Sequence, residues 1–463
     1  MNPDVAARLS AAAVVAVAIA GCTLQPAYVK PPVVLPAVWQ EAASLADSVP
    51  SWPERDWWRG FADPTLDALV EAALANNHDL KAAVSRIAQA RSTARIANAS
   101  LYPAVDGKLK RERSNEFSGG SRVDTFGAAL SVIYDPDLWG KSRSFRRAAK
   151  ADVLSAEFAS ANVALALQAD VTVTYLLLAT LDQRTNLALR NIDAALRIDS
   201  IIEARFQAGA VSELDVAQSK TSLASIEATL PGLEQSHQQT LQALAILTGR
   251  NPSDLVVQPP PVTRFTLPAA LPVGAPSELL QRRPDLRQAE ANLIAANANI
   301  GVARAMLFPS ISLTGQGGYA SDQLSRFVRD SNSVLMLGAS VLAPIFHGGS
   351  LRANVDRSNE RYEELVQDYY QTVLGAMRDV EGALVAVQKL GEQETRLKEA
   401  ERQAQRAFEL AEIRYRSGAI DAITMLNAQN TWLGLQNAVL QAHASQLAAL
   451  VSLFKALGGG GQS

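Results

Sequence analysis

The chain repeats its own order of motifs in two halves, and this duplication constrains the fold more than any other feature. The segment "NNHDLKAAVSRIAQARSTARIANASLYPAV" aligns with "RRPDLRQAEANLIAANANIGVARAMLFPSI", so that Asp79 matches Asp285 and Pro103 matches Pro309. Further on, "YDPDLWGK" aligns with "LAPIFHGG", and "RFQAGAVSELDVAQ" aligns with "RYRSGAIDAITMLNAQ". The offset grows only from 206 residues (79 to 285) to 209 residues (209 to 418). Because no shorter period occurs, two similar halves are predicted rather than a solenoid.

Each half is predicted to run as helix, hairpin, long helix and helix. The first helices are expected from about Pro64 to Ser100 and from about Ser277 to Leu307. Each is followed by an aromatic residue and a proline, at Tyr102-Pro103 and Phe308-Pro309. Proline disfavours helical geometry in the residue before it, so the chain is expected to become extended there.

Four segments after these prolines have the character of strands, near 104–114, 123–134, 310–320 and 333–343. In "TFGAALSVIY" the alternation places Phe126, Ala128, Leu130, Val132 and Tyr134 on one face, with Thr125, Gly127 and Ser131 on the other. Strands of this length can cross a membrane when tilted. The polar segments "SNEFSGGSR" and "DQLSRFVRDSN" are expected as the exposed ends of the two hairpins.

Aromatic side chains gather at the helix-side ends of the predicted strands. They are Tyr102, Tyr134, Trp139, Phe308 and Phe346. Two interpretations stay open: a girdle at a membrane interface, or core packing at a corner between strand and helix.

A very long helix is predicted in each half. Neither proline nor glycine occurs between Lys141 and Phe206. In the second half, apolar side chains recur every three or four residues, as in a coiled-coil seam: Val366, Tyr369, Val373, Met377, Val380, Leu384 and Val387. Sixty-odd residues at about 1.5 Å each give a rod on the order of 100 Å. Both rods are expected to end at glycine turns, at Gly209 and Gly418, and return helices follow toward Leu247 and Leu457.

Charge and hydropathy narrow the class of protein. The formal net charge of -3 gives no reason to expect a nucleic-acid partner. Beyond the N-terminal region there is no uninterrupted apolar run of about 20 residues, so a membrane crossing would require a β-barrel. Four strands cannot close a barrel, since the smallest transmembrane barrels have about eight strands. The chain is therefore expected to form oligomers that cover the open edges.

The only cysteine, Cys22, follows a short apolar run at Leu9–Ala20. The tetrad "IAGC" resembles a bacterial lipobox, in which cleavage before the cysteine frees Cys22 for acylation. An ordinary buried cysteine is the alternative. Thr23 stands where an aspartate would indicate retention at the inner membrane, so the expected location is the outer membrane.

Prolines divide the chain. Six fall between Pro26 and Pro53, and seven of the 21 fall between Pro252 and Pro276. Such clusters break helices and are typical of leaders and connectors. The predicted organisation is a signal peptide at 1–21, a proline-rich leader at 22–63, a first repeat at 64–250, a connector at 251–276, a second repeat at 277–457 and a flexible tail at 458–463.

The residue pattern predicts neither catalysis nor a bound metal or cofactor. His78, His237, His347 and His443 are scattered and form no ligand pair at metal-binding spacing. No phosphate-binding glycine loop or nucleophile elbow is present in the sequence. An enzyme is not expected.

Several motifs in the same order resemble the TolC-type outer-membrane efflux proteins: "WWRGFADPTLDALVEAALANNHDL", "RRPDLRQAEANLIAANANIGVARAMLFPSISLTG", "APIFHGGSLRANV" and "RYRSGAIDAITMLNAQ". The leader "GCTLQPAYVKPPVVLPAVW" is similar to that of the NodT-like lipoprotein subgroup, which serves resistance-nodulation-division pumps. The resemblance covers about residues 22–457. It implies a mainly α fold with a membrane β part, in a homotrimer whose four strands per chain form a twelve-stranded β-barrel continued by an α-helical barrel.

The same resemblance implies a function. The trimer would be a passive exit duct for small molecules, lipid-anchored in the outer membrane and extending into the periplasm. Its partners would be a periplasmic adaptor protein, an inner-membrane resistance-nodulation-division transporter and outer-membrane lipid. Two alternatives remain: the exit duct of a type I protein secretion system, and a periplasmic coiled-coil scaffold that never enters the membrane. The lipobox and the leader favour efflux of small molecules.

In this family the periplasmic tip closes like an iris, and charged side chains ring the aperture. The candidates here are Asn427, Asn430, Asp421, Asp215 and Glu213. Asn427 stands at the position that often holds an aspartate, and Asn430 lies three residues later, on the same helical face. The alternative is that both asparagines are ordinary solvated residues.

Overall fold

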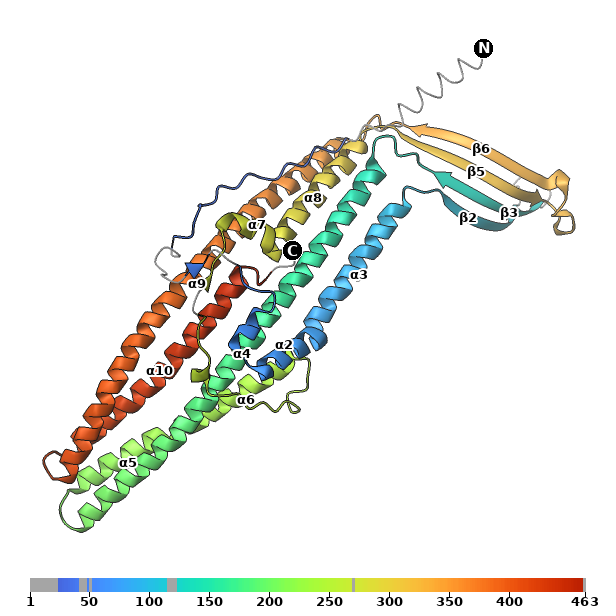
Figure 1. Cartoon of the computed structure of the whole chain (residues 1–463). Helices are drawn as coiled ribbons and strands as arrows, with labels where there is room; N and C mark the ends of the chain where they lie inside the picture. The colour runs from blue at the N-terminus through green and yellow to red at the C-terminus, as the bar shows by residue number, and fades with distance from the viewer. Residues whose placement is uncertain (1–23, 41–47, 50–51, 115–122, 269–270, 461–463) are drawn as a thin grey trace. The chain divides into compact units, whose positions relative to one another are not determined.

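The computed structural model describes residues 24–40, 48–49, 52–114, 123–268 and 271–460. The chain forms two compact units. Unit 1 comprises the described residues up to Pro32 together with Ser85–Glu157 and Gln288–Tyr370, and unit 2 comprises the rest. Each unit therefore contains segments from both halves of the duplication. Two long helices, α4 (Lys141–Gln207) and α9 (Ser350–Arg416), pass from one unit into the other (Figure 1).

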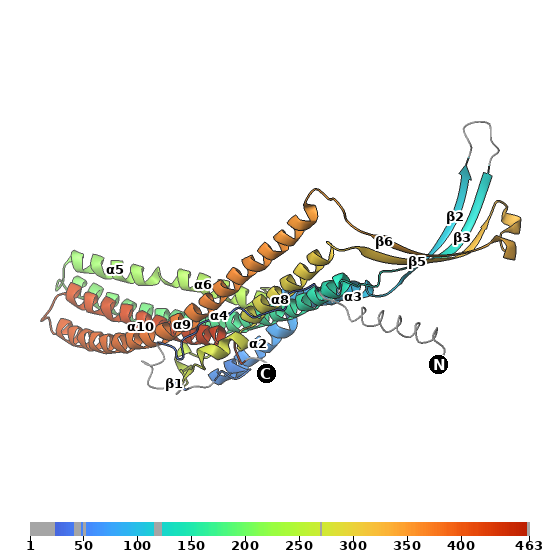
Figure 2. The same ribbon diagram turned by 90° about the horizontal axis from the view of Figure 1, so that it is seen from above.

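Unit 1 holds a four-stranded antiparallel sheet in the order β2-β3-β5-β6. Its strands are β2 (Ala104–Ser114), β3 (Val123–Tyr134), β5 (Ser310–Ser321) and β6 (Ser333–Leu342). The four predicted strands are confirmed, with ends that differ by one residue at most. Pairing of β3 with β5 joins the hairpins of the two halves into one curved sheet (Figure 2). Two short 3-10 turns, η5 (Leu324–Arg326) and η6 (Asp330–Asn332), lie between β5 and β6.

The prediction of one helix from Pro64 to Ser100 is wrong. Two helices occur instead, α2 (Pro64–Asn76) and α3 (His78–Ala99). Asn77 leaves the helical region with a ψ of 131°. Its side chain accepts a hydrogen bond from the Leu80 N–H at 3.0 Å and donates one to the Leu247 carbonyl at 3.0 Å. Asparagine competes in this way with helix continuation, and here it begins the next helix as an N-cap.

The corresponding prediction of one helix from Ser277 to Leu307 is also wrong. The segment contains η4 (Pro276–Glu278), α7 (Leu279–Arg282) and α8 (Pro284–Ala305). Arg283 is extended, with a ψ of 123°, because Pro284 follows it. Proline fits the first position of the new helix, where its missing N–H costs nothing. The break stands 206 residues after Asn77 (77 to 283), so the duplication is preserved in the fold.

Both long helices have 67 residues, which corresponds to about 100 Å at 1.5 Å per residue. In α9 the predicted seam is largely buried: Tyr369, Val373, Val380, Leu384 and Val387 are buried, and Val366 and Met377 are half-buried. The return after α9 is a single helix, α10 (Ala422–Ala456), as expected. The return after α4 is divided into α5 (Glu213–Glu227) and α6 (Leu230–Leu247), so the expectation of one helix is wrong there. Pro231, in the first turn of α6, removes a backbone N–H at the division.

In unit 2 the leader and the connector pack against the helices. Strand β1 (Ser48–Val49) pairs in parallel with β4 (Leu271–Pro272), and the buried Trp39 indole donates to the Val273 carbonyl at 2.9 Å. The aromatic turn η2 (Trp57–Phe61) contacts Phe454 through Trp57, with ring centroids 5.2 Å apart. These contacts build an aromatic core from segments that carry many prolines.

Two buried polar groups fix further segments of unit 2. The Asp63 carboxylate caps α2 by accepting from the Thr65 N–H at 2.8 Å, and it accepts from the Tyr175 hydroxyl at 3.1 Å. His443 of α10 lies 3.0 Å from Glu394 through Nδ1, and 3.0 Å from the carbonyl of Phe265 through Nε2. Phe265 follows the turn η3 (Val262–Arg264), so His443 ties the connector to α9 and α10.

One helix in the described part of the chain is long and apolar enough to cross a membrane by composition alone. It is α4, and 56% of its most apolar window is buried inside the protein. A core helix of a soluble domain passes the same test, so this observation does not by itself indicate a membrane span.

Candidate functional site: a two-faced sheet and the ends of the long helices

The register of the sheet separates apolar from polar side chains. On one face, Leu130 stands between Gly107 and Gly317, and Gly317 is opposite Leu335. A Cβ added to Gly107 would meet the Leu130 side chain at 3.8 Å, which places both residues on the same face. Further members of this face are Val105, Leu109, Phe126, Ala128, Val132, Leu313, Tyr319, Leu337 and Val341, and Arg111 and Arg113 join it at the end of β2 that is far from the helices. Leu130, Leu335 and Leu337 are largely exposed, so this face presents an apolar surface.

The opposite face is mostly polar or small, although Ile133 of β3 and Val334, Met336 and Leu342 of β6 also lie on it. Ser131 lies opposite Asp106 on β2 and Gln316 on β5, and Gly127 lies opposite Lys110. A Cβ added to Gly127 would meet Lys110 Cβ at 3.8 Å, so Lys110 belongs to this face. Lys108 and Glu112 share it because side chains alternate along a strand. An apolar face backed by a polar one is the pattern of a strand with lipid on one side and water on the other.

The outer edges of the sheet are open. Among the described residues, β2 pairs only with β3 and β6 pairs only with β5. Both strands therefore present backbone N–H and C=O groups along one edge. In lipid such an edge is not viable, because no water is present to satisfy these groups.

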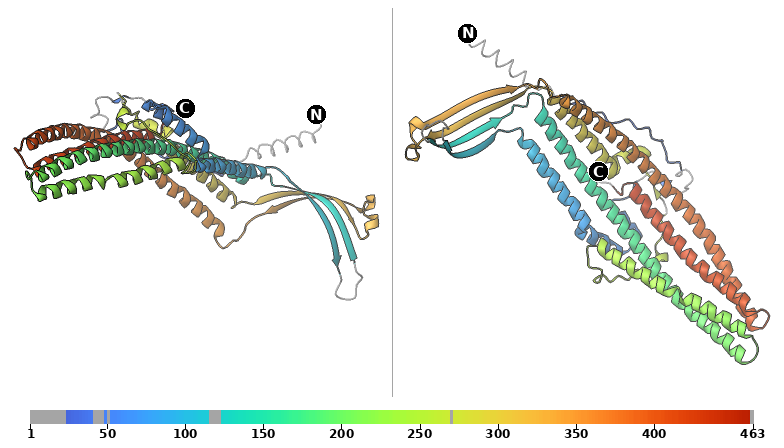
Figure 3. Two further views of the ribbon diagram at one scale, coloured as in Figure 1. Left: turned by 90° about the horizontal axis from the view of Figure 1, so that it is seen from below. Right: turned by 180° about the vertical axis from the view of Figure 1, so that it is seen from behind.

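The long helices α4 and α9 end at identical turns in unit 2 (Figure 3). Gly209 has a φ of 73°, and the Ala210 N–H bonds to the Arg205 carbonyl at 2.9 Å. Gly418 has a φ of 75°, and the Ala419 N–H bonds to the Arg414 carbonyl at 2.8 Å. This six-residue closure with a left-handed glycine ends a helix by satisfying its last carbonyls.

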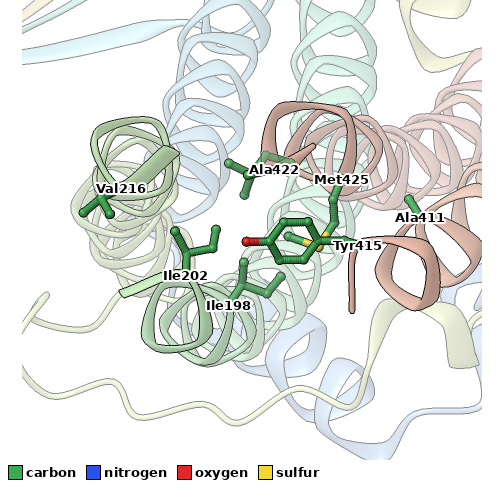
Figure 4. Packing of buried hydrophobic residues seen from close by; sticks show 8 residues of the cluster. Ile198, Ile202, Val216, Ala411, Tyr415, Ala422 and Met425 are labelled. Atoms are coloured by element: carbon green, nitrogen blue, oxygen red, sulfur yellow. The ribbon is translucent and has the colours of Figure 1, made fainter. Parts of the chain in front are cut away.

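A hydrophobic cluster holds the four helix ends together (Figure 4). It consists of Ile198, Ile202, Val216, Ala411, Tyr415, Ala422, Met425 and Leu426. Arg205 covers one side of it, because its guanidinium lies 4.7 Å from the Tyr415 ring centroid and donates to the carbonyls of Tyr415 and Arg416 at 2.9 Å each. Arg205 is not among the residues that the sequence indicates for the tip. Its only local signal is a basic residue in the last turn of α4, and the carbonyls that it binds are more than 200 positions away.

Two of the acidic gate candidates cap helices. Asp215 forms a capping box with Ser212 at the start of α5. Asp421 is the N-cap of α10, and its carboxylate accepts from the Thr424 N–H at 3.0 Å. Hydrogen bonding from Thr424 lowers the pKa of Asp421 below its ordinary value. Both carboxylates therefore have a local structural role at the tip.

The asparagine candidates differ from one another. The Asn430 side chain accepts a hydrogen bond from the Ser222 hydroxyl at 3.3 Å, which links α10 to α5. Asn427 and Glu213 are exposed at the same end of unit 2, and no hydrogen bond from either side chain is seen within the described ranges. The two asparagines, which the sequence places on one helical face, therefore differ in the structure: the Asn430 side chain links two helices, and the Asn427 side chain is free to face solvent.

The aromatic candidates at the helix-side ends of the strands divide between the two interpretations. Trp139 stacks on Phe308 with centroids 4.9 Å apart, and its indole donates to the Pro309 carbonyl. Tyr102 and Phe346 are instead 64% and 86% exposed. Trp139 and Phe308 therefore fit packing at the corner between strand and helix. Tyr102 and Phe346 are exposed, as side chains of an interfacial girdle would be.

The acylation candidate Cys22 lies outside the described residues, which begin at Leu24. Within the described residues, no group of three or more His, Cys, Asp or Glu side chains could hold a metal ion.

Comparison with known proteins identifies the class of molecule that carries this geometry. The sequence profile of the outer membrane efflux protein family matches twice, at residues 69–250 and at residues 275–459. The chain belongs to the outer membrane efflux protein family. Each half of the duplication accordingly has the family's pattern. The family is one of efflux channels rather than of enzymes.

Relatives extend over almost the full length. The pyoverdine export outer membrane protein OpmQ of Pseudomonas aeruginosa is 37% identical, over 96% of this chain and 95% of its own length. The solvent efflux pump outer membrane protein SrpC of Pseudomonas putida is 33% identical, over 96% of both chains. Among solved structures, the outer-membrane channel OprN has a TM-score of 0.89 at 29% identity, covering 95% of this chain and 99% of its own. The Campylobacter jejuni CmeC outer membrane channel has a TM-score of 0.90 at 29% identity, covering 95% of this chain and 96% of its own.

Proposed function

We propose that three copies of this chain form one exit duct in the outer membrane. The edge of β2 in one copy would pair with the edge of β6 in the next, which gives a closed barrel of twelve strands. The observation that carries this proposal is the four-stranded sheet with an apolar face, a polar face and two open edges. Closure satisfies the edges, directs Leu130 and Leu335 toward lipid, and leaves Ser131 and Lys110 facing a water-filled lumen.

The duct would continue into the periplasm as an α-helical barrel that ends at Gly209 and Gly418. Asn427 would line the aperture of this tip, since its side chain is exposed there. Asp421 and Asp215 would shape the tip as helix caps, and Asn430 would brace α10 against α5. Glu213 would add negative charge near the opening. A periplasmic adaptor and an inner-membrane resistance-nodulation-division transporter would complete a tripartite pump.

Small molecules are the proposed cargo. The names of two relatives refer to pyoverdine export and to solvent efflux. A duct without chemistry of its own takes its specificity from the transporter that loads it. These names favour small-molecule efflux over protein secretion as the function of the chain.

We further propose that Cys22 is the acylated first residue of the mature protein. Support comes from the lipobox-like "IAGC" and from membership in an outer membrane family. Mass spectrometry of the N-terminal peptide from the native host should show a diacylglyceryl cysteine. An N-terminus that begins at Met1 would refute the assignment.

The exit-duct proposal is tested by deleting the gene and restoring it on a plasmid. Loss of the duct should raise the cellular accumulation of a fluorescent pump substrate, and the wild-type gene should reverse the effect. A matched variant, Leu130→Arg, should restore efflux less well than the wild-type gene, because the charge impairs insertion of its barrel. Protein that is recovered only from the soluble periplasm would support the scaffold alternative instead.

A further inference from the structure

The described N-terminal leader follows a groove between helices α4 and α8 in unit 1. Gln25 accepts a hydrogen bond from Arg147 of α4 at 2.9 Å, and the Pro26 carbonyl accepts one from Asn297 of α8 at 2.9 Å. Further along, Lys30 pairs with Glu290 of α8 at 2.7 Å. As the leader's residue numbers rise, its contacts move from Asn297 back to Glu290. The leader therefore runs antiparallel to α8, and its N-terminal end points toward the strands.

A glycine allows the leader to lie close to both helices. A Cβ added to Gly301 would come within 2.7 Å of Gln25 Cβ and 2.8 Å of Ser144 Oγ. Any larger residue at 301 would push the leader out of the groove. The position and direction of Gln25 are thus fixed by one close contact and one hydrogen bond.

A pocket of about 380 Å³ with mostly apolar walls lies where α4 and α8 meet the strands. Its helical walls are the first residues of α4, Lys141 and Ser142, and the last of α8, Ala305 and the adjoining Met306. Its apolar walls are Leu138, Trp139, Phe308, Pro309, Ile311 and Leu342. Asp135, Asp137 and His347 also border it, and the Asp137 carboxylate accepts hydrogen bonds from the backbone N–H groups of Ser142 and Arg143 at 2.9 Å each.

The pocket continues the path of the leader. On α8 the residues that face the leader are Glu290, Asn297 and Gly301. Their spacings of seven and four residues place them on one face of the helix. The same face next contains Ala305, the last residue of α8, and Phe308 follows in the turn after the helix; both line the pocket. On α4, Ser144 and Arg147 face the leader, and Lys141 precedes them by one turn on the same side.

The length of chain before Gln25 matches the distance to the pocket. From Gly301 to Ala305 the axis of α8 advances about 6 Å, at 1.5 Å per residue. Cys22 precedes Gln25 by three positions, and an extended chain covers about 10 Å in three residue steps. A group attached to residue 22 therefore reaches the pocket without any movement of Gln25.

From this geometry we infer that the pocket binds an acyl chain carried by Cys22. The inference rests on the proposed acylation and adds the place where the lipid lies. Trp139 and Phe308 supply flat apolar walls for an alkyl chain, and the leader in its groove holds the glyceryl end nearby. Each protomer would thereby bind its own lipid at the junction of strand and helix, and the leader would be held at both ends.

The test is photocrosslinking in the full-length protein purified from outer membranes of its host. Phe308 is replaced by p-benzoylphenylalanine, which preserves an aromatic ring at the pocket wall. Phe346 is replaced in the matched control, because it is an exposed aromatic at the same junction and does not line the pocket. After irradiation, mass spectrometry identifies the species attached to each position. The N-terminal peptide is analysed in the same samples.

The expected product joins position 308 to the diacylglyceryl peptide that begins at Cys22, with none at position 346. Ala343→Trp, which fills the pocket from an exposed wall position, should abolish this product, whereas Ala353→Trp outside the pocket should leave it unchanged. A product with a phospholipid alone, or no lipid product, on a protein whose N-terminal peptide is acylated would overturn the inference while the acylation stands. An unmodified N-terminal peptide would show that the proposed acylation itself is wrong.

Discussion

Replacing Leu130 with arginine tests the two-faced sheet most directly. Leu130 lies on the apolar face of β3, between the glycines Gly107 and Gly317, and is 61% exposed in a single chain. Its neighbour Ser131 points to the other face, where it contacts the Asp106 carbonyl. The paired substitutions Leu130→Arg and Ser131→Arg therefore place the same charge one residue apart, on opposite sides of the sheet.

The expected cost follows from the depth of Leu130 in the membrane. A strand that rises about 3.4 Å per residue and is tilted by about 45° gains about 2.4 Å of depth per residue. Leu130 precedes the helix-side end of β3 at Tyr134 by four residues, which is about 10 Å of depth. The midplane of an apolar band about 25 Å tall lies about 12 Å from that end. An arginine this close to the midplane should cost about 2–4 kcal/mol per chain.

The assay is folding from urea into phospholipid vesicles, followed by electrophoresis without heating. Folded trimer and unfolded monomer migrate differently, and the urea midpoint reports the free energy of folding. Leu130→Arg should lower this free energy by the amount above, and Ser131→Arg by less than about 1 kcal/mol, because position 131 faces water. Leu130→Ala separates the loss of the leucine from the introduction of charge. Equal losses for the two arginine variants would show that the assignment of the faces is wrong.

Three further predictions concern unit 2. Asp63→Ala should lower the free energy of unfolding by about 1–3 kcal/mol in urea titrations, because it removes a helix cap and leaves the buried Tyr175 hydroxyl without its acceptor. Asp421→Ala should lower the melting temperature at pH 7, because it removes the N-cap of α10. The pKa of Asp421 is lower in the folded state than in the unfolded state. The difference in melting temperature from wild type should therefore begin to shrink below about pH 4 and should vanish once the pH is below the folded-state pKa. Asn427→Asp should raise cation selectivity in planar bilayers and Asn427→Lys should favour anions; unchanged reversal potentials would place the aperture elsewhere.

Local chemistry explains why much of the architecture is readable from the sequence. Pro103 and Pro309 keep Tyr102 and Phe308 out of the helical conformation, so the chain cannot continue α3 and α8 there. Gly209 and Gly418 adopt a left-handed conformation within the turn itself. The alternation along β3 likewise assigns its faces without reference to any partner, whereas β6 has four successive apolar residues and does not alternate. The same effect of proline on the residue before it explains the break at Arg283, which precedes Pro284. The break is not predicted, because the residues on both sides of it have a helical pattern.

Other features depend on partners that are distant in sequence, and only the tertiary structure determines them. Asn77 breaks its helix while bonding to the Leu247 carbonyl, and the Asn430 side chain is held by Ser222. Arg205 acquires its role from carbonyls at the end of α9. A polar side chain can form hydrogen bonds with several kinds of partner, so the local sequence does not show which partner it has in the fold. The sequence of this protein therefore determines where its strands and the two longest helices lie, whereas packing of the two halves decides where the shorter helices break and which polar side chains brace the tip.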